Sequence, residues 1–214
     1  MTADVKPPRR YESKMRDEQA RRTRRAVLAA AHRQFVEQGY AATTVAGVAA
    51  DAGVSVETVY KPFRNKPSLA KAAFDVAAVG DDEPIPMLQR ESVRRNMAEP
   101  DPHKKLHTYA DDLAQRAPRM GPLLLVLRDA AATDSAAAEV WAQLQQERLT
   151  GMTAFAHHLR DGGHLRDGVS WQEARDVLWA HTSVEIWDLL VQQRGWSKTR
   201  FGKWTGQQLV AALL

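Results

Sequence analysis

The segment from Thr43 to Lys66, TTVAGVAADAGVSVETVYKPFRNK, limits the possible folds of this chain more than any other stretch. Thr44 is a suitable N-cap for a short helix whose small apolar residues recur at helical spacing. Gly53 can adopt the left-handed backbone conformation that a tight turn between helices requires. The first half of the segment therefore predicts one short helix followed by a sharp turn.

The second half of the segment predicts another short helix. Ser55 can cap it, and Pro62 helps to end it after residues 56–61 because proline has no amide hydrogen. Two short helices joined by a turn that contains glycine are typical of a helix-turn-helix, whose second helix enters the DNA major groove. An ordinary helical hairpin has the same pattern. The local sequence at 44–63 leaves both interpretations open.

The charge distribution favours a DNA-binding function. Residues 1–66 contain 13 Lys and Arg against 7 Asp and Glu, a net charge of +6, whereas residues 67–214 contain 17 against 19, a net charge of −2. Positive charge is thus concentrated beside the helix-turn-helix pattern, as expected for a phosphate-binding module. Residues 1–17 include Pro7, Pro8, Arg9, Arg10 and Lys14 and have almost no apolar periodicity, so we expect a disordered basic arm there.

Composition excludes several classes of protein. The sequence has no cysteine, which rules out disulfides and thiolate metal sites. No apolar run approaches the length that spans a membrane, and the N-terminal residues lack the apolar segment of a secretory signal. We therefore expect a cytoplasmic protein with no membrane partner.

Helical periodicity continues along the whole chain. Val27, Leu28, Ala31 and Phe35 share one face of a helix expected at 18–38, which Gly39 should end. Further helices are expected at 66–79, 87–97, 103–116, 121–132, 135–160, 171–193 and 198–214. No strand-like alternation competes with them, so the fold class is all-α. The segment 80–86, GDDEPIP, predicts a linker between a domain at 18–79 and a domain at 87–214.

The last two expected helices are rich in apolar residues, which could pack in the domain core or against a second copy of the chain. The residues concerned are Val177, Leu178, Val184, Trp187, Leu190, Phe201, Trp204, Leu209, Val210 and Leu213. Pairing with a second copy would give a four-helix bundle and a two-fold dimer. A dimer also suits DNA recognition, because two recognition helices then meet two half-sites.

The run from Arg25 to Phe74 resembles the N-terminal domain of TetR-type (tetracycline-repressor-like) transcriptional regulators. The residues that carry the resemblance are Gly39-Tyr40, Thr43-Thr44, Val48-Ala49, Gly53-Val54-Ser55, Thr58-Val59-Tyr60, Phe63 and Lys66. More loosely, LRDAAATDSAAAEVWAQLQQERLTGM and VLWAHTSVEIWDLLVQQRGWS resemble the ligand-binding domains of such regulators. The resemblance implies an all-α homodimer. An N-terminal three-helix DNA-binding domain would be followed by a larger C-terminal domain for ligand binding and dimerisation.

The resemblance also implies which residues contact the double-stranded operator DNA. These are Thr44, Ser55, Val56, Glu57, Thr58, Tyr60, Lys61 and Lys66. Thr44, Tyr60 and Lys66 match phosphate-contacting positions, and Lys61 could reach a phosphate or a base. Glu57 could accept a hydrogen bond from cytosine, or it could simply balance the helix dipole. Pro62 departs from the usual aromatic residue or histidine, so it carries no DNA role.

Such regulators usually repress transcription and release the operator when a small molecule binds. Candidate residues for contact with a small apolar or amphipathic effector are Arg128, Trp141, Phe155, Trp179, His181, Glu185 and Trp187. They combine aromatic walls with a few polar anchors, as binding pockets do, although aromatic residues such as these are more often ordinary core. All six tryptophans lie in the C-terminal domain.

The sequence offers no pattern for catalysis or for a cofactor. His103 and His107 are spaced like a pair of metal ligands but lack a clear third ligand, and His157, His158 and His164 lack regular spacing. There is neither a Gly-x-Ser-x-Gly elbow nor a glycine-rich phosphate loop. We therefore expect a regulator and not an enzyme. The alternative is a DNA-binding architectural protein without an effector.

Overall fold

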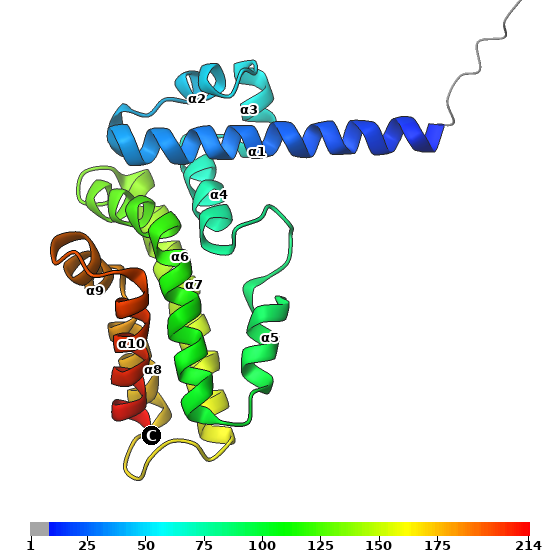
Figure 1. Ribbon diagram of the computed structural model, residues 1–214. Coiled ribbons are helices and arrows are strands. Elements are labelled where there is room, and N and C mark those ends of the chain that lie inside the picture. The colour runs from blue at the N-terminus through cyan, green and yellow to red at the C-terminus, as the bar shows by residue number, and fades with distance from the viewer. Residues whose placement is uncertain (1–8) are drawn as a thin grey trace, which may run out of the picture. The chain divides into compact units, whose positions relative to one another are not determined.

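The computed structural model describes residues 9–214, with side chains from Met15 onward. These residues form helices and no strands (Figure 1), which confirms the all-α class that the periodicity predicts. The chain divides into two compact units, one ending at Ala73 and the other running from Phe74 to Leu214. The division falls inside a helix and not in the segment 80–86, where we expected it.

The N-terminal unit contains α1 (Arg9–Ala42), α2 (Val45–Asp51), α3 (Val56–Phe63) and the first part of α4 (Lys66–Val79), up to Ala73. The expected disorder of residues 1–17 is wrong from Arg9 onward, because α1 begins there. Arginine, lysine, glutamate and methionine dominate that stretch, and they favour a helix even without an apolar face. The rest of the expected arm lies outside the described residues. Gly39 interrupts α1 as predicted, with φ of 80° and ψ of 169°.

Helix α1 provides the surface on which the first short helix packs, and the second packs on the first. Its apolar face, formed by Val27, Leu28, Ala31 and Phe35, is buried as expected. Helix α2 packs against α1, and α3 packs against α2. Their buried side chains are Val45, Val48, Ala49, Val59 and Phe63. Full burial of a valine or phenylalanine contributes about 1.5–3 kcal/mol, so this packing is the main source of stability for both short helices.

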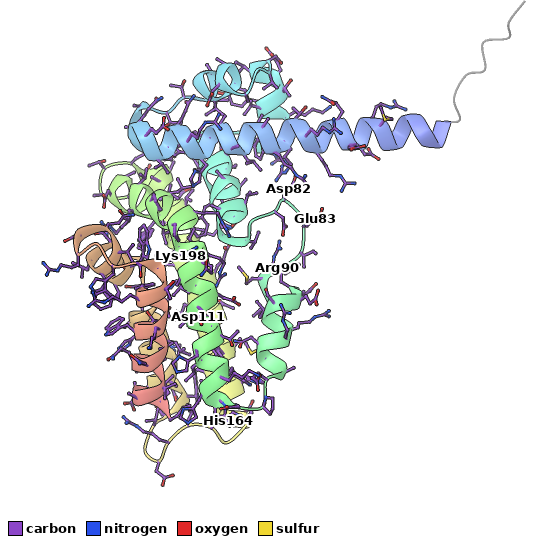
Figure 2. The ribbon with its side chains drawn as sticks, viewed as in Figure 1. Asp82, Glu83, Arg90, Asp111, His164 and Lys198 are labelled. Carbon is purple, nitrogen blue, oxygen red and sulfur yellow. The ribbon has the colours of Figure 1, made fainter. Side chains whose placement is uncertain are left out.

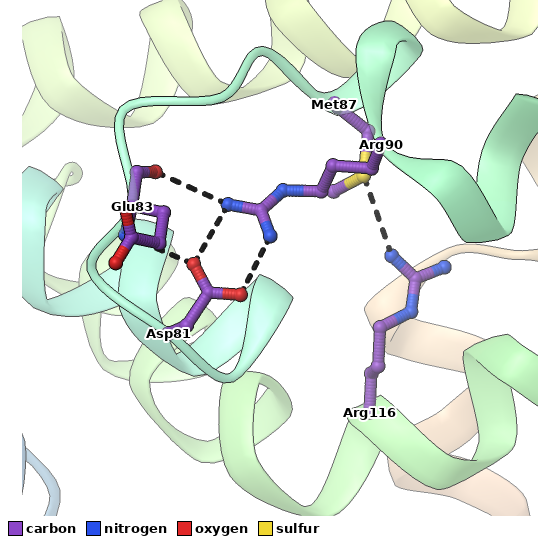
Figure 3. Close-up of polar contacts among 5 residues, drawn as sticks. All are labelled: Asp81, Glu83, Met87, Arg90 and Arg116. Atoms are coloured by element: carbon purple, nitrogen blue, oxygen red, sulfur yellow. Dashed lines mark hydrogen bonds and ion pairs between the residues drawn. The ribbon is translucent and has the colours of Figure 1, made fainter.

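The segment between α4 and the next helix is non-helical, as expected for 80–86, but its side chains hold it in one conformation (Figure 3). The guanidinium of Arg90 donates to both carboxylate oxygens of Asp81, at 2.7 and 3.0 Å, and to the Glu83 carbonyl at 3.3 Å. The carboxylate of Asp81 raises the pKa of Arg90. A bidentate pair of this kind fixes orientation as well as contributing energy.

The C-terminal unit continues from α4 with η1 (Met87–Gln89), α5 (Glu91–Ala98), α6 (Pro102–Ala130), α7 (Ser135–Asp161), α8 (Trp171–His181), α9 (Val184–Trp187), the π-helix η2 (Asp188–Gln193) and α10 (Lys198–Leu213). Four of these helices form a closed bundle, because α6 packs on α7, α7 on α8, α8 on α10 and α10 on α6. Within residues 9–214, no helix is both long enough and apolar enough to span a membrane.

Two expected helix boundaries in this unit are wrong. The helices expected at 103–116 and 121–132 are one helix, α6, which contains Pro118 and Pro122. Burial of Ala117, Gly121 and Leu123 in the bundle offsets the backbone hydrogen bonds that the prolines remove. Conversely, the helix expected at 171–193 breaks after His181, since the hydroxyl of Ser183 accepts from the Ile186 amide and starts α9.

Glycines allow the helices of the bundle to approach closely. At Gly202 on α10, an added Cβ would lie 2.8 Å from the carboxylate of Asp111 on α6, which Figure 2 labels. At Gly206, an added Cβ would lie 2.4 Å from the His107 ring, and Gly121 makes a comparable contact with Trp187. Helix α10 therefore needs small residues on the face that meets α6.

The apolar residues of the last helices divide between the two alternatives that the sequence left open. Six of them are buried within the chain itself: Leu178, Val184, Trp187, Phe201, Leu209 and Leu213. The half-buried ones are Val177, Leu190, Trp204 and Val210. Most of this apolar surface is thus core, and only the second group is available to a partner.

A buried lysine and a histidine join the ends of three helices in this unit. Lys105, which is 2% exposed, donates to the Met97 carbonyl at 3.0 Å and lies 2.5 Å from Nε2 of His158. Burial lowers the pKa of Lys105, and burial together with the Lys105 charge lowers the pKa of His158. Other charges acting on the pair come from Glu99, Asp161 and His164. The neutral imidazole is therefore the form that the fold favours.

We expect the free energy of unfolding to fall as the pH is lowered from about 7.5 to about 5.5. The unfolded chain binds a proton at His158 near the ordinary pKa of 6.5, whereas the folded protein does not until the pH is lower. Urea midpoints at the two pH values measure the effect. His158→Gln, which keeps an acceptor for Lys105 but does not titrate, should show a smaller fall. The same fall in both proteins would contradict this role of His158.

Candidate nucleic-acid interface

The turn between α2 and α3 has the geometry that the sequence predicts. The hydroxyl of Thr44 accepts from the Gly47 amide at 2.9 Å, and the hydroxyl of Ser55 accepts from the Thr58 amide at 3.3 Å. Gly53 has a φ of 66°, in the left-handed region. Both caps and the turn glycine are therefore confirmed. They fix the direction of α3 relative to α2.

One face of α3 is polar and accessible, while the other belongs to the core. Val59 and Phe63 are buried, and Val56 is half-buried. The exposed residues are Glu57, Thr58, Tyr60, Lys61 and Pro62. Pro62 lies inside α3, which ends one residue later at Phe63. The accessible surface is therefore a short strip along one side of the helix.

Glu57 interacts with the start of its own helix. Hydrogen bonds from its own amide and from the Ser55 hydroxyl lower the pKa of Glu57. A carboxylate in the first turn is also stabilised by the helix dipole. These contacts support the interpretation in which Glu57 balances the dipole, over the one in which it accepts from cytosine.

Tyr60 and Lys66, both expected to contact phosphates, differ in their surroundings. Tyr60 is 47% exposed. The ammonium of Lys66 donates to the Ala41 carbonyl at 3.3 Å and lies 4.3 Å from the centroid of the Tyr40 ring. Lys66 thus has a structural role that the sequence pattern did not indicate: it joins the start of α4 to the end of α1.

Two further contacts of the N-terminal unit were not predicted. The guanidinium of Arg24 lies 4.8 Å from the centroid of the Phe63 ring, which brings a positive charge from α1 to the end of α3. Arg33 pairs with Asp51 at 3.0 Å and joins α1 to α2. Arginines on α1 were visible in the sequence, but no local spacing rule links them to residues so far along the chain. An exposed pair such as Arg33 and Asp51 contributes little to stability.

The candidate effector residues lie in different surroundings within the C-terminal unit. Phe155 is buried with its ring 5.1 Å from that of Tyr109, and Trp187 is buried against Gly121. The polar candidates Arg128 and Glu185 are brought together, at 3.5 Å. The remaining candidates, Trp141, Trp179 and His181, are half-buried. Nδ1 of His181 lies 3.0 Å from the Val177 carbonyl, within its own helix.

The sequence of the N-terminal unit matches a known family. Residues 27–73, which run from α1 into α4, match the model of the bacterial regulatory proteins of the tetR family. Over these residues the chain is similar to the TetR family. The HTH-type transcriptional regulator TtgR of Pseudomonas putida is 41% identical over 58 residues, which cover 27% of this chain and 28% of that protein. The similarity in sequence to that relative is thus confined to little more than the TetR-type DNA-binding domain.

The TetR fold itself extends over most of the chain. The fatty acid degradation regulator FadR from Bacillus halodurans has a TM-score of 0.70 at 17% identity, with 88% of this chain and 98% of that one covered. FadR from Bacillus subtilis, solved in complex with stearoyl-CoA, has a TM-score of 0.68 at 16% identity, with the same coverage of 88% and 98%. At these identities, the likeness shows a common fold and no common ligand.

We expect Lys66→Ala to lower the free energy of unfolding by roughly 1 kcal/mol, because it removes both the cation–π contact and the hydrogen bond. Lys61→Ala is the matched control, since Lys61 is an exposed lysine on the neighbouring helix. It should change stability by less than about 0.5 kcal/mol. Urea denaturation without DNA measures both. Equal stability of the two variants would mean that the Lys66 contacts contribute nothing.

Proposed function

We propose that this protein is a dimeric transcriptional regulator that represses by binding an operator and releases it when a small molecule binds. The observation that supports this most directly is the capped α2–turn–α3 unit, with an accessible polar strip on α3, within the segment that matches the TetR-family model. Because operator DNA is its partner, we propose that the protein acts in the cytoplasm and has no enzymatic activity.

In this proposal α3 is the recognition helix. Thr58 and Lys61 contact the groove, and Tyr60 contacts a phosphate from the flank of the same strip. Thr44 lies at the start of α2, where its cap leaves the outer side of the helix end free to meet the DNA backbone. Lys66 adds positive charge while it holds α4 to α1. Ser55 and Glu57 order the first turn of α3. Val56 lies at the edge of the polar strip on this helix.

We propose that two chains pair through the outer faces of α8 and α10. Trp204 is half-buried and its ring meets that of Trp196, with 5.9 Å between centroids. Trp204, Val177 and Val210 leave apolar surface that a second copy can cover, and Leu189 is 48% exposed nearby in the sequence. Pairing through these residues would place two recognition helices on one DNA duplex.

We propose that the C-terminal unit binds the effector. The indole N–H of Trp187 is buried and has no acceptor among the residues that the structure describes. Buried donors are normally paired, so such a group suits a polar atom of a ligand. Trp187 follows Glu185 on α9, and Glu185 pairs with Arg128. Trp141 and Phe155 on α7, with Trp179 and His181 on α8, complete the candidate set.

We expect the protein to bind a specific site in the DNA that flanks its own gene, as two chains per site. Footprinting locates the site, and light scattering of the complex counts the chains. Tyr60→Ala and Lys61→Ala should each weaken binding, and Lys61→Ala should reduce the slope of log affinity against log salt by about 1. Gln143→Ala, at an exposed position on α7, is the control with unchanged affinity.

Binding that ignores DNA sequence, with no release by any tested small molecule, would instead support an architectural protein. Unchanged affinity in both the Tyr60 and the Lys61 variants would contradict the role of α3.

A further inference from the structure

An arginine lies on the inward face of α7, at a position where the apolar periodicity of the helix predicts an apolar residue. Leu144, Met152, Phe155 and Leu159 recur at helical spacing along this face and are all buried. Arg148 has the position between Leu144 and Met152, at the same spacing. Its surroundings lower the pKa of its guanidinium by desolvation. A cation in such a place costs free energy unless something pairs with it.

The contacts of Arg148 satisfy hydrogen bonds but do not neutralise its charge. The guanidinium donates to the Trp179 carbonyl and to the Thr182 hydroxyl, the latter at 3.2 Å, and it lies 4.2 Å from the centroid of the Trp179 ring. These partners are all neutral. Glu185 acts on Arg148 through its charge but forms its ion pair with Arg128. In the part of the chain that the structure describes, no carboxylate is recorded in an ion pair with Arg148.

Two hydroxyl groups lie in the same region. The hydroxyl of Tyr109 donates to Sδ of Met152 at 3.5 Å. The hydroxyl of Thr182 is 3.9 Å from the same sulfur, but it donates to the Leu178 carbonyl at 2.6 Å. Thioether sulfur is a weak acceptor, so the Tyr109 hydroxyl can donate to a better one. A cation and a hydroxyl donor thus converge within a shell of Met152, Phe155 and Leu178, which belong to the apolar core.

We propose that Arg148, with the hydroxyl of Tyr109, binds the carboxylate of an amphipathic effector whose apolar part lies against this core. This inference rests on the proposed function and names the chemical class of the effector. A guanidinium binds a carboxylate through two parallel hydrogen bonds. A single guanidinium balances a monoanion but not a doubly charged phosphate, which would be left partly unneutralised in the interior.

The test compares ligands that differ only in the head group: sodium decanoate and 1-decanol, with phenylbutyrate and phenylbutanol as a second pair. Isothermal calorimetry on the full chain measures each affinity. In the unsubstituted protein, at least one acid should bind about tenfold or more tightly than its alcohol, as expected for charge-assisted hydrogen bonds. Failure of both acids to bind, or equal binding of acid and alcohol, would overturn the proposal.

Arg148→Gln removes the charge but keeps an amide that can donate to the Trp179 carbonyl, so the end of α8 remains capped. This variant should lose the preference for acid over alcohol, and Tyr109→Phe should reduce it. A preference that persists in Arg148→Gln would overturn the assignment. If Arg148→Gln does not fold, Tyr109→Phe still decides, because an undiminished preference in that variant excludes this site.

Operator binding, measured on the same samples, separates the two proposals. Sequence-specific DNA binding without a preference for acids means that this inference fails while the regulator stands. Absence of DNA binding in the unsubstituted protein means that the proposed function itself fails.

Discussion

Helices α2 and α3, of 7 and 8 residues, are too short to be stable alone, and the whole N-terminal unit depends on their packing against α1 and each other. Isolated helices below about 12–15 residues are marginal in water. Burial of Val48, Val59 and Phe63 supplies the missing stability, and the caps at Thr44 and Ser55 set where each helix begins. The polar strip of α3 keeps one orientation only because its opposite face is core.

The C-terminal unit follows a different rule, because its helices are long and its close contacts depend on small residues. Gly202 and Gly206 let α10 approach α6, and Gly121 accommodates the Trp187 ring. Within that apolar bundle Arg148 and Lys105 are exceptions, each with neutral partners. Both join helix ends, since Arg148 caps the end of α8, but only Arg148 has beside it a hydroxyl, that of Tyr109, whose acceptor is a weak one, the Met152 sulfur. We therefore assign a structural role to the first and a ligand to the second.

The sequence predicted those features that depend on residues close together in the chain. The caps at Thr44 and Ser55, the left-handed Gly53 and the apolar face of α1 were all confirmed. Features that depend on distant partners were not predicted. Two helices were expected at 103–116 and 121–132, but bundle packing carries α6 through Pro118 as one helix. Lys66 matched a phosphate-contacting position, and nothing in its neighbourhood indicated its contacts with Tyr40 and Ala41. For the same reason, the inward position of Arg148 became informative only once Trp179 and Thr182 were beside it.

The most direct test of the account is a site-specific cross-link from α3 to DNA. A photoreactive benzoylphenylalanine is placed at Tyr60 in one sample and at the exposed Gln143 of α7 in another, each bound to the operator found by footprinting. If α3 is the recognition helix, irradiation should link position 60 to the operator, scrambled DNA should compete poorly, and position 143 should give no link. Retained operator binding with no link from position 60, or equal links from both positions, would contradict the account.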